Sequence, residues 1–160
     1  MRKPQEKRRF PSALLVISLT LLVPLTLSIV PPVGAAPYVI TIVSVETTDQ
    51  AGNPRNVFWR GELVMIKVKL SCPGGGYSPV SYPYIQFVRT TDPDLRMVYL
   101  GFMSSTISSG ENQSSTTGFT IPLTATTGQY KVKVMLWNTR PSNPQFQVLA
   151  AARQATFTVT

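Results

Sequence analysis

Alternation of apolar and polar side chains is the feature of this sequence that most restricts its fold. Over residues 64–71, one set of alternate positions is apolar and holds Val64, Ile66, Val68 and Leu70. Successive side chains of a β-strand point to opposite faces of its sheet, so this period of two predicts a strand with one buried face. The same pattern returns near the C-terminus, where the apolar positions are Tyr130, Val132, Val134 and Leu136.

Further strands are predicted between turn-forming residues along the rest of the chain. No segment after residue 37 keeps helical spacing, whereas strand-like runs cover residues 38–47, 81–90, 96–103, 118–123 and 155–160. Residues 104–118 are rich in serine and threonine and predict a polar hairpin region, and residues 148–155 predict an irregular first half of the last strand. Seven or eight strands with frequent turns predict an all-β, two-sheet antiparallel sandwich.

The first of these strands changes phase along its length. Ile40 and Ile42 share one face, and Val43 and Val45 share the other. A β-bulge, or a strand that passes from one sheet to the other, produces such a change.

The first 36 residues resemble a secretory signal peptide. Five basic residues precede an apolar run from Ala13 to Val30, and the small residues Gly34, Ala35 and Ala36 follow it. This order predicts cleavage after Ala35 or Ala36. The alternative is an uncleaved helical membrane anchor, since 18 apolar residues approach the length that spans a bilayer. We therefore expect export by the general secretory route to the cell surface or the extracellular space, with one domain over residues 37–160.

The leader also accounts for about half of the net charge. The whole chain carries +8, but residues 37–160 hold ten basic and six acidic residues, which leaves +4. No basic run occurs in this part, so we expect no nucleic-acid partner. Membrane contact is expected only through the leader, if it is retained.

A family resemblance supports the sandwich prediction. The stretch TGQYKVKVMLWN around Tyr130 resembles the sixth strand of immunoglobulin-like and fibronectin-III-like domains, and residues 58–70 resemble their second strand. Such domains are common in secreted surface proteins of prokaryotes, archaea included. The resemblance implies that Tyr130 is the tyrosine of the corner before that strand. It departs from antibody domains, because the pair of inter-sheet cysteines is absent.

Few residues in the sequence are suited to catalysis. The chain has no histidine and one cysteine, which excludes histidine-dependent nucleophilic systems and a structural zinc site. No phosphate-binding or dinucleotide motif occurs, so we expect neither an enzyme nor a cofactor. Asp92 and Asp94 are the one close carboxylate pair and are weak candidates for a calcium site, with ordinary turn chemistry as the alternative.

Three other features are candidates for function or modification. Asn112 begins an Asn-Gln-Ser glycosylation sequon, and Cys72 is either a core residue or a thiol that pairs between chains. Trp59, Met135 and Trp137 form either a contact patch or a second core layer under a covering loop.

These observations leave three functional hypotheses. The first is a non-catalytic domain for binding, adhesion or display, whose partner is a protein, a surface glycan or another copy of itself. The second is a subunit of an extracellular filament or lattice in which residues 38–47 complete a neighbour's sheet, with donor residues Tyr38, Ile40, Ile42, Val43 and Val45. The third is an enzyme acting on surface polysaccharide.

Overall fold

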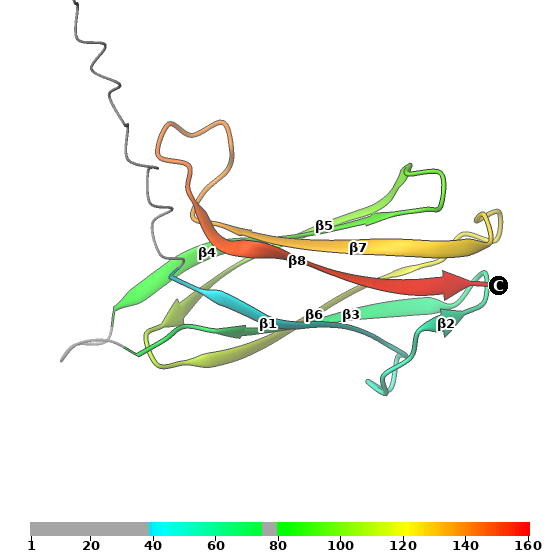
Figure 1. Cartoon of the computed structure of the whole chain (residues 1–160), viewed down its shortest axis with the longest axis horizontal. Helices are drawn as coiled ribbons and strands as arrows, with labels where there is room; N and C mark the ends of the chain where they lie inside the picture. Colours follow the sequence, from blue (N-terminus) through cyan, green and yellow to red (C-terminus); the bar gives the residue numbers. More distant parts are fainter. Residues whose placement is uncertain (1–38, 75–79) are drawn as a thin grey trace, which may run out of the picture. The chain divides into compact units, whose positions relative to one another are not determined.

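The computed structural model describes residues 39–74 and 80–160, which form two sheets packed face to face (Figure 1). The strands are β1 (Thr41–Thr48), β2 (Val57–Phe58), β3 (Leu63–Ser71), β4 (Ser81–Thr91), β5 (Met97–Ser108), β6 (Asn112–Thr120), β7 (Gly128–Trp137) and β8 (Val148–Val159). One sheet has the order β1-β3-β6 and the other β2-β8-β7-β4-β5. The predicted all-β sandwich is thereby confirmed. The predicted leader, residues 1–36, and Tyr38 lie outside the described residues.

No helix that could cross a membrane occurs within residues 39–74 and 80–160.

Strand pairing is antiparallel except at one short contact. Val57 and Phe58 of β2 lie parallel to Thr158 and Val159 at the end of β8. The prediction of a purely antiparallel sandwich was therefore wrong at this point. The segment was missed because two residues are too few to show alternation.

The core contains the apolar positions that the alternation predicted. All four inward residues of β3 and of β7 are buried, as are Phe157 and Val159 of β8. The outward lysines of these strands, Lys67, Lys69, Lys131 and Lys133, keep solvent contact. Burial of apolar surface from both sheets supplies the main stabilisation of such a sandwich.

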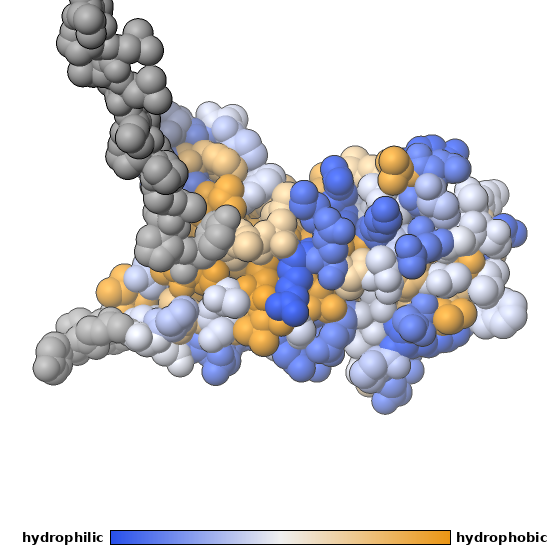
Figure 2. Space-filling view, in the orientation of Figure 1, coloured by the Kyte–Doolittle hydropathy of each residue, from blue (hydrophilic) through white to orange (hydrophobic). Residues whose placement is uncertain are grey.

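The change of phase in the first strand corresponds to a bulge, one of the two predicted alternatives. The backbone N–H of Ile40 donates to the carbonyl of Leu149 in β8, 3.2 Å away, whereas Ile42 pairs with Leu70 of β3. A register shift between Ile42 and Ser44 marks a bulge, and Val43 within it is exposed. A shallow hollow of about 330 Å³ lies beside the start of β1 and the middle of β8. Hydrophobic surface gathers in the same region in Figure 2.

β6 lies in a segment that was predicted to be a polar hairpin, and that prediction was wrong. β5 and β6 follow each other across a tight turn but belong to different sheets. The polar side chains of β6 instead bond across the core: Ser115 Oγ donates to Gln86 Oε1 of β4 at 2.8 Å, and Tyr84 Oη donates to Gln113 Oε1 at 2.8 Å. Buried polar groups are tolerated where they find such partners.

The end of β6 also differs from the prediction. The strand stops at Thr120, and Leu123, the last residue of the predicted strand 118–123, is 77% exposed. Pro122 follows Ile121 and has no N–H to continue the ladder, which explains why the strand ends here.

Aromatic side chains from both sheets pack together at one end of the sandwich. Tyr130 Oη donates to the carbonyl of Thr126 at 2.8 Å, which is the corner contact that the family resemblance implied. At the same end of the sandwich, Tyr99 of β5 stacks on Phe119 of β6 with 4.7 Å between ring centroids, and its hydroxyl bonds Thr117. This contact holds the edge of the five-stranded sheet against the smaller sheet. Phe157 of β8 connects the two tyrosines, since it stacks on Tyr130 at 5.2 Å and lies 6.4 Å from Phe119.

Candidate functional site: the outer face of the five-stranded sheet

Aromatic side chains from three strands and one loop form a row on the outer face of the five-stranded sheet. Phe87 of β4 is 6.2 Å from Phe102 of β5 and 4.0 Å from Trp137 of β7, measured between ring centroids. Phe146, in the loop between β7 and β8, packs edge-on against Trp137 at 5.3 Å. In Figure 1 this loop projects beyond the sheet at one end. We call these four residues the aromatic row.

The aromatic row is partly open to solvent. Phe102 is 68% exposed, while Phe87, Trp137 and Phe146 are half-buried against one another. Met135 pairs in register with Phe87 and extends the row across β7. Trp137 therefore fits both predicted alternatives in part. Phe146 covers one side of its ring, as in a second core layer, and the ring still reaches the surface, as in a contact patch.

Of the three residues predicted as a contact patch, the structure brings only two together. Met135 and Trp137 lie on this face, whereas Trp59 lies in the turn after β2 and is 62% exposed. The backbone N–H of Trp59 donates to the carboxylate of Glu62 at 2.7 Å, so the turn itself explains its position.

A basic hollow lies beside the aromatic row on the same face. Strand pairing sets Arg89 of β4 opposite Lys133 of β7, and Thr91 opposite Lys131. With Met97 and Gln154, these residues line a hollow of about 270 Å³. The outer face of the five-stranded sheet therefore has an apolar half, the aromatic row, and a cationic half. We call the cationic half the basic hollow.

The basic hollow was not predicted from the sequence. Alternation shows that Lys131 and Lys133 share a face of one strand, but it does not show which strand lies beside them. The pairing of β4 with β7 is what places Arg89 next to these lysines.

Asp92 and Asp94 lie in the turn between β4 and β5, where both carboxylates pair with Arg96. Arg96 donates from its backbone N–H to Asp92 Oδ1 at 2.9 Å and from Nε to Oδ2 at 2.8 Å, and its Nη2 reaches Asp94 Oδ2 at 2.8 Å. Desolvation raises the pKa of Asp92, but the hydrogen bonds and charge of Arg96 outweigh it and hold that pKa below its ordinary value. Within residues 39–74 and 80–160, no group of three or more potential metal ligands occurs.

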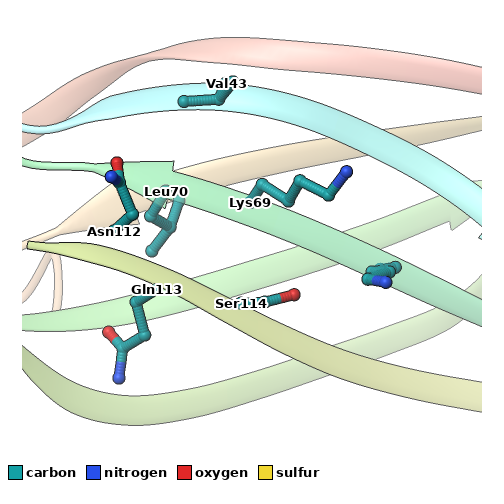
Figure 3. A pocket seen from close by; sticks show the side chains of 7 residues that line it. Val43, Lys69, Leu70, Asn112, Gln113 and Ser114 are labelled. Carbon is teal, nitrogen blue, oxygen red and sulfur yellow. The ribbon is translucent and has the colours of Figure 1, made fainter.

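Asn112 is exposed at the start of β6, beside a hollow of about 350 Å³ on the outer face of the three-stranded sheet. Figure 3 shows this hollow with Val43 on one side, Ser114 on the other and Lys69 between them. Asn112 is accessible for glycosylation, as its sequon requires, and it belongs to the sheet opposite the aromatic row.

The candidate donor strand pairs within its own domain. Residues 41–48 form β1 and pair along β3, and Ile40 and Ile42 are buried in the core. Val45 is half-buried and Val43 is exposed at the bulge. Donation of this strand to a neighbour would therefore require its own sheet to open.

Cys72 is a core residue at the end of β3. It is buried, and its Sγ lies 3.5 Å from the carbonyl of Val39. Burial, followed by the charge of Glu111, raises the pKa of the thiol, which disfavours the reactive thiolate. Of the two predicted roles of Cys72, a core residue or a thiol that pairs between chains, the structure agrees with the core residue.

Comparison with known proteins bears on the fold only. No protein-family model and no curated protein matches the chain. Among solved structures, the C-terminal domain of Wzt aligns with a TM-score of 0.60 at 10% identity, over 76% of this chain and 74% of that one. At such low identity this likeness shows a shared β-sandwich fold and no activity.

Two further alignments are looser. A CARDB domain from Pyrococcus furiosus, crystallised with di-metal ions, aligns with a TM-score of 0.47 at 14% identity, over 76% of this chain and 87% of that one. The Pseudomonas fluorescens alkylpurine DNA glycosylase AlkC aligns with a TM-score of 0.48 at 14% identity, over 76% of this chain. This chain spans only 30% of that enzyme's length.

Proposed function

We propose that this chain is an exported, non-catalytic binding domain of the immunoglobulin-like kind, which contacts its partner through the outer face of the five-stranded sheet. The observation that carries the proposal is the partly exposed aromatic row. Large exposed apolar side chains that gather on one face are typical of contact surfaces. The basic head, apolar run and small residues of the first 36 residues support export.

A binding role without catalysis is supported by how the carboxylates are used. Each of the six in residues 37–160 bonds within a turn or an ion pair: Glu46 to Lys69, Asp49 to Asn53, Glu62 to Arg55, Asp92 and Asp94 to Arg96, and Glu111 to Ser108. General acid–base chemistry needs a titratable group free to meet a substrate, and none of these six carboxylates faces the aromatic row.

Retention of the purified protein on isolated cell envelopes of the producing organism tests this function. Phe102→Ala removes the most exposed ring of the row and is expected to reduce the retained fraction strongly. Leu123→Ala is the matched control, because Leu123 is at least as exposed but lies outside this sheet. Equal retention of the two variants, or no retention of the parent protein, would refute the proposal.

A second candidate function is assembly of copies through the free edge of β5. Within the described residues β5 pairs only with β4, and its twelve residues include no charge and no proline. Natural edge strands usually carry such residues to prevent pairing with other chains. At a two-fold interface each residue near the axis meets its own copy, and a charge-free strand avoids repulsion there.

Light scattering after size-exclusion chromatography tests assembly. Leu100→Lys places a charge on the exposed side of β5 and is expected to convert assembled protein to monomer. Leu123→Lys introduces the same charge away from the edge and should leave the mass unchanged. A parent protein that is monomeric at all concentrations would exclude this function.

A further inference from the structure

We infer that the outer face of the five-stranded sheet binds an acidic polysaccharide. This inference rests on the proposed binding function and names the chemical class of the partner. It is carried by the position of the basic hollow directly beside the aromatic row.

Strand register places the two halves of this surface in adjacent rows. Phe102, Phe87 and Met135 face one another across β5, β4 and β7, and the next outward positions along the same strands are Leu100, Arg89 and Lys133. Outward positions on one strand are about 7 Å apart, since the rise per residue is about 3.4 Å. One extended ligand can therefore contact both rows at once.

The cations of the hollow are available to a ligand. Arg89, Lys131 and Lys133 take part in none of the ion pairs of the described residues, which use Arg55, Lys69 and Arg96 instead. No carboxylate lines the hollow. Three cations of one sign on neighbouring strands repel one another, and an anionic ligand would relieve that repulsion.

The aromatic row favours a sugar over other anions. Aromatic rings pack against the apolar C–H faces of pyranose rings, and Tyr, Trp and Phe supply rigid contact area with little loss of side-chain entropy. The row runs over three strands, roughly 10 Å at the usual strand spacing, and continues onto Phe146 of the neighbouring loop. A chain of several sugar units can follow such a surface.

Other occupants fit this face less well. A second copy bound through the same face, with the basic hollow near the two-fold axis, would bring like charges together, because Arg89, Lys131 and Lys133 would oppose their own counterparts. An acidic peptide or polymer without rings would meet the cations but would leave Phe102 exposed.

Fluorescence titration can test this inference, because the chain has only two tryptophans. The variant Trp59→Phe leaves Trp137, within the aromatic row, as the reporter. Three probes separate the contributions: polygalacturonate, which is acidic and has sugar rings; dextran, which has rings without charge; and polyglutamate, which is charged without rings. We expect Trp137 emission to change with polygalacturonate only, with affinity falling as salt is added.

Variants of each half of the surface sharpen the test. Lys131→Gln with Lys133→Gln is expected to weaken polygalacturonate binding about tenfold or more, since charge-assisted hydrogen bonds are lost. Phe102→Ala should also weaken it. Lys67→Gln is the matched control, because Lys67 lies on the outer face of the other sheet.

Each remaining outcome overturns the inference. Equal binding of polyglutamate would indicate simple ion exchange, equal binding of dextran would show that the charge is irrelevant, and no response to polygalacturonate would exclude this ligand class. Retention on cell envelopes that still depends on Phe102 would then preserve the proposed binding function while the acidic polysaccharide is rejected.

Discussion

Thr90 occupies a fully buried position on the inner face of β4, yet its hydroxyl has no hydrogen-bond partner among the described residues. An unpaired buried hydroxyl costs free energy, and valine has nearly the same shape without that group. We therefore expect Thr90→Val to raise the free energy of unfolding by about 1 kcal/mol. Urea-induced unfolding measures this change.

Another buried hydroxyl serves as a control of opposite sign. Ser115→Ala removes the hydroxyl that donates to Gln86 Oε1 and leaves that buried oxygen unpaired. This variant should lower the free energy of unfolding by about 1–3 kcal/mol. If both variants destabilise the protein equally, the environment assigned to Thr90 is incorrect.

At the residue scale, the sequence predicted burial correctly where the buried residues are apolar and the exposed residues are polar. Val64 through Leu70 follow one clean alternation, and all four inward residues were identified correctly. Gln86 and Thr90 could not be identified, because apolar side chains occupy both faces of β4 around them. A buried glutamine becomes acceptable only through Ser115, a partner 29 residues away in the other sheet.

At the element scale, the contact between β5 and β6 depends on a glycine. A Cβ atom at Gly101 would clash with Tyr99 Oη, and the Tyr99 ring is held in place by Phe119 and Thr117. We expect Gly101→Ala to displace this tyrosine and lower the free energy of unfolding by roughly 1–3 kcal/mol, as overpacking usually does. Thermal or urea unfolding measures the loss.

A double-mutant cycle identifies the cause of that loss. In a Tyr99→Ala background the ring is absent, so Gly101→Ala should have little further effect. Losses that simply add in the double variant would contradict the steric explanation.

The turn between β4 and β5 predicts a dependence of stability on pH. Because the pKa of Asp92 is lower in the folded than in the unfolded state, its contribution is complete above the unfolded pKa and is lost as the pH falls through the folded pKa. The stability difference between parent and Asp92→Asn should therefore be largest near neutral pH and shrink in acid. Urea unfolding between pH 7 and pH 2 measures it, and a constant difference would show that Asp92 is not the group responsible.

Asp94→Asn is the control for that experiment. It removes the exposed partner of Arg96, and an exposed ion pair typically contributes less than about 1 kcal/mol. If Asp94→Asn lowered the free energy of unfolding as much as Asp92→Asn does, the stabilising interaction would not be specific to Asp92.

Elements were predictable from the sequence where one face is apolar and the other polar, and were missed elsewhere. β3 and β7 meet this condition. β6 does not, since its inward residues Gln113, Ser115 and Thr117 bond to polar groups of the facing sheet instead of packing against apolar ones. Serine and threonine thus form a strand of the smaller sheet in a segment that was predicted to be a polar hairpin region.

At the scale of the whole molecule, the candidate site depends on strand order. Phe87, Phe102, Arg89, Lys131 and Lys133, the main strand residues of the aromatic row and the basic hollow, are outward positions of predicted strands. Their meeting follows from the order β7-β4-β5, which local patterns do not contain. The sequence therefore predicted Met135 and Trp137 as contact residues but did not associate them with Phe102 or Arg89.

The whole-molecule proposal also fixes where the mature chain should begin. Ile40 is buried and its N–H bonds to β8, so the fold requires the chain from this residue onward, and cleavage after Ala35 or Ala36 leaves the domain intact. We expect protein recovered from the medium or the cell surface to start at Ala36 or Pro37, as N-terminal sequencing would show. Its intact mass should match residues 36–160 or 37–160, with any excess equal to a glycan on Asn112. Recovery of surface protein that retains the basic head would contradict cleavage and would indicate a form anchored by residues 13–30.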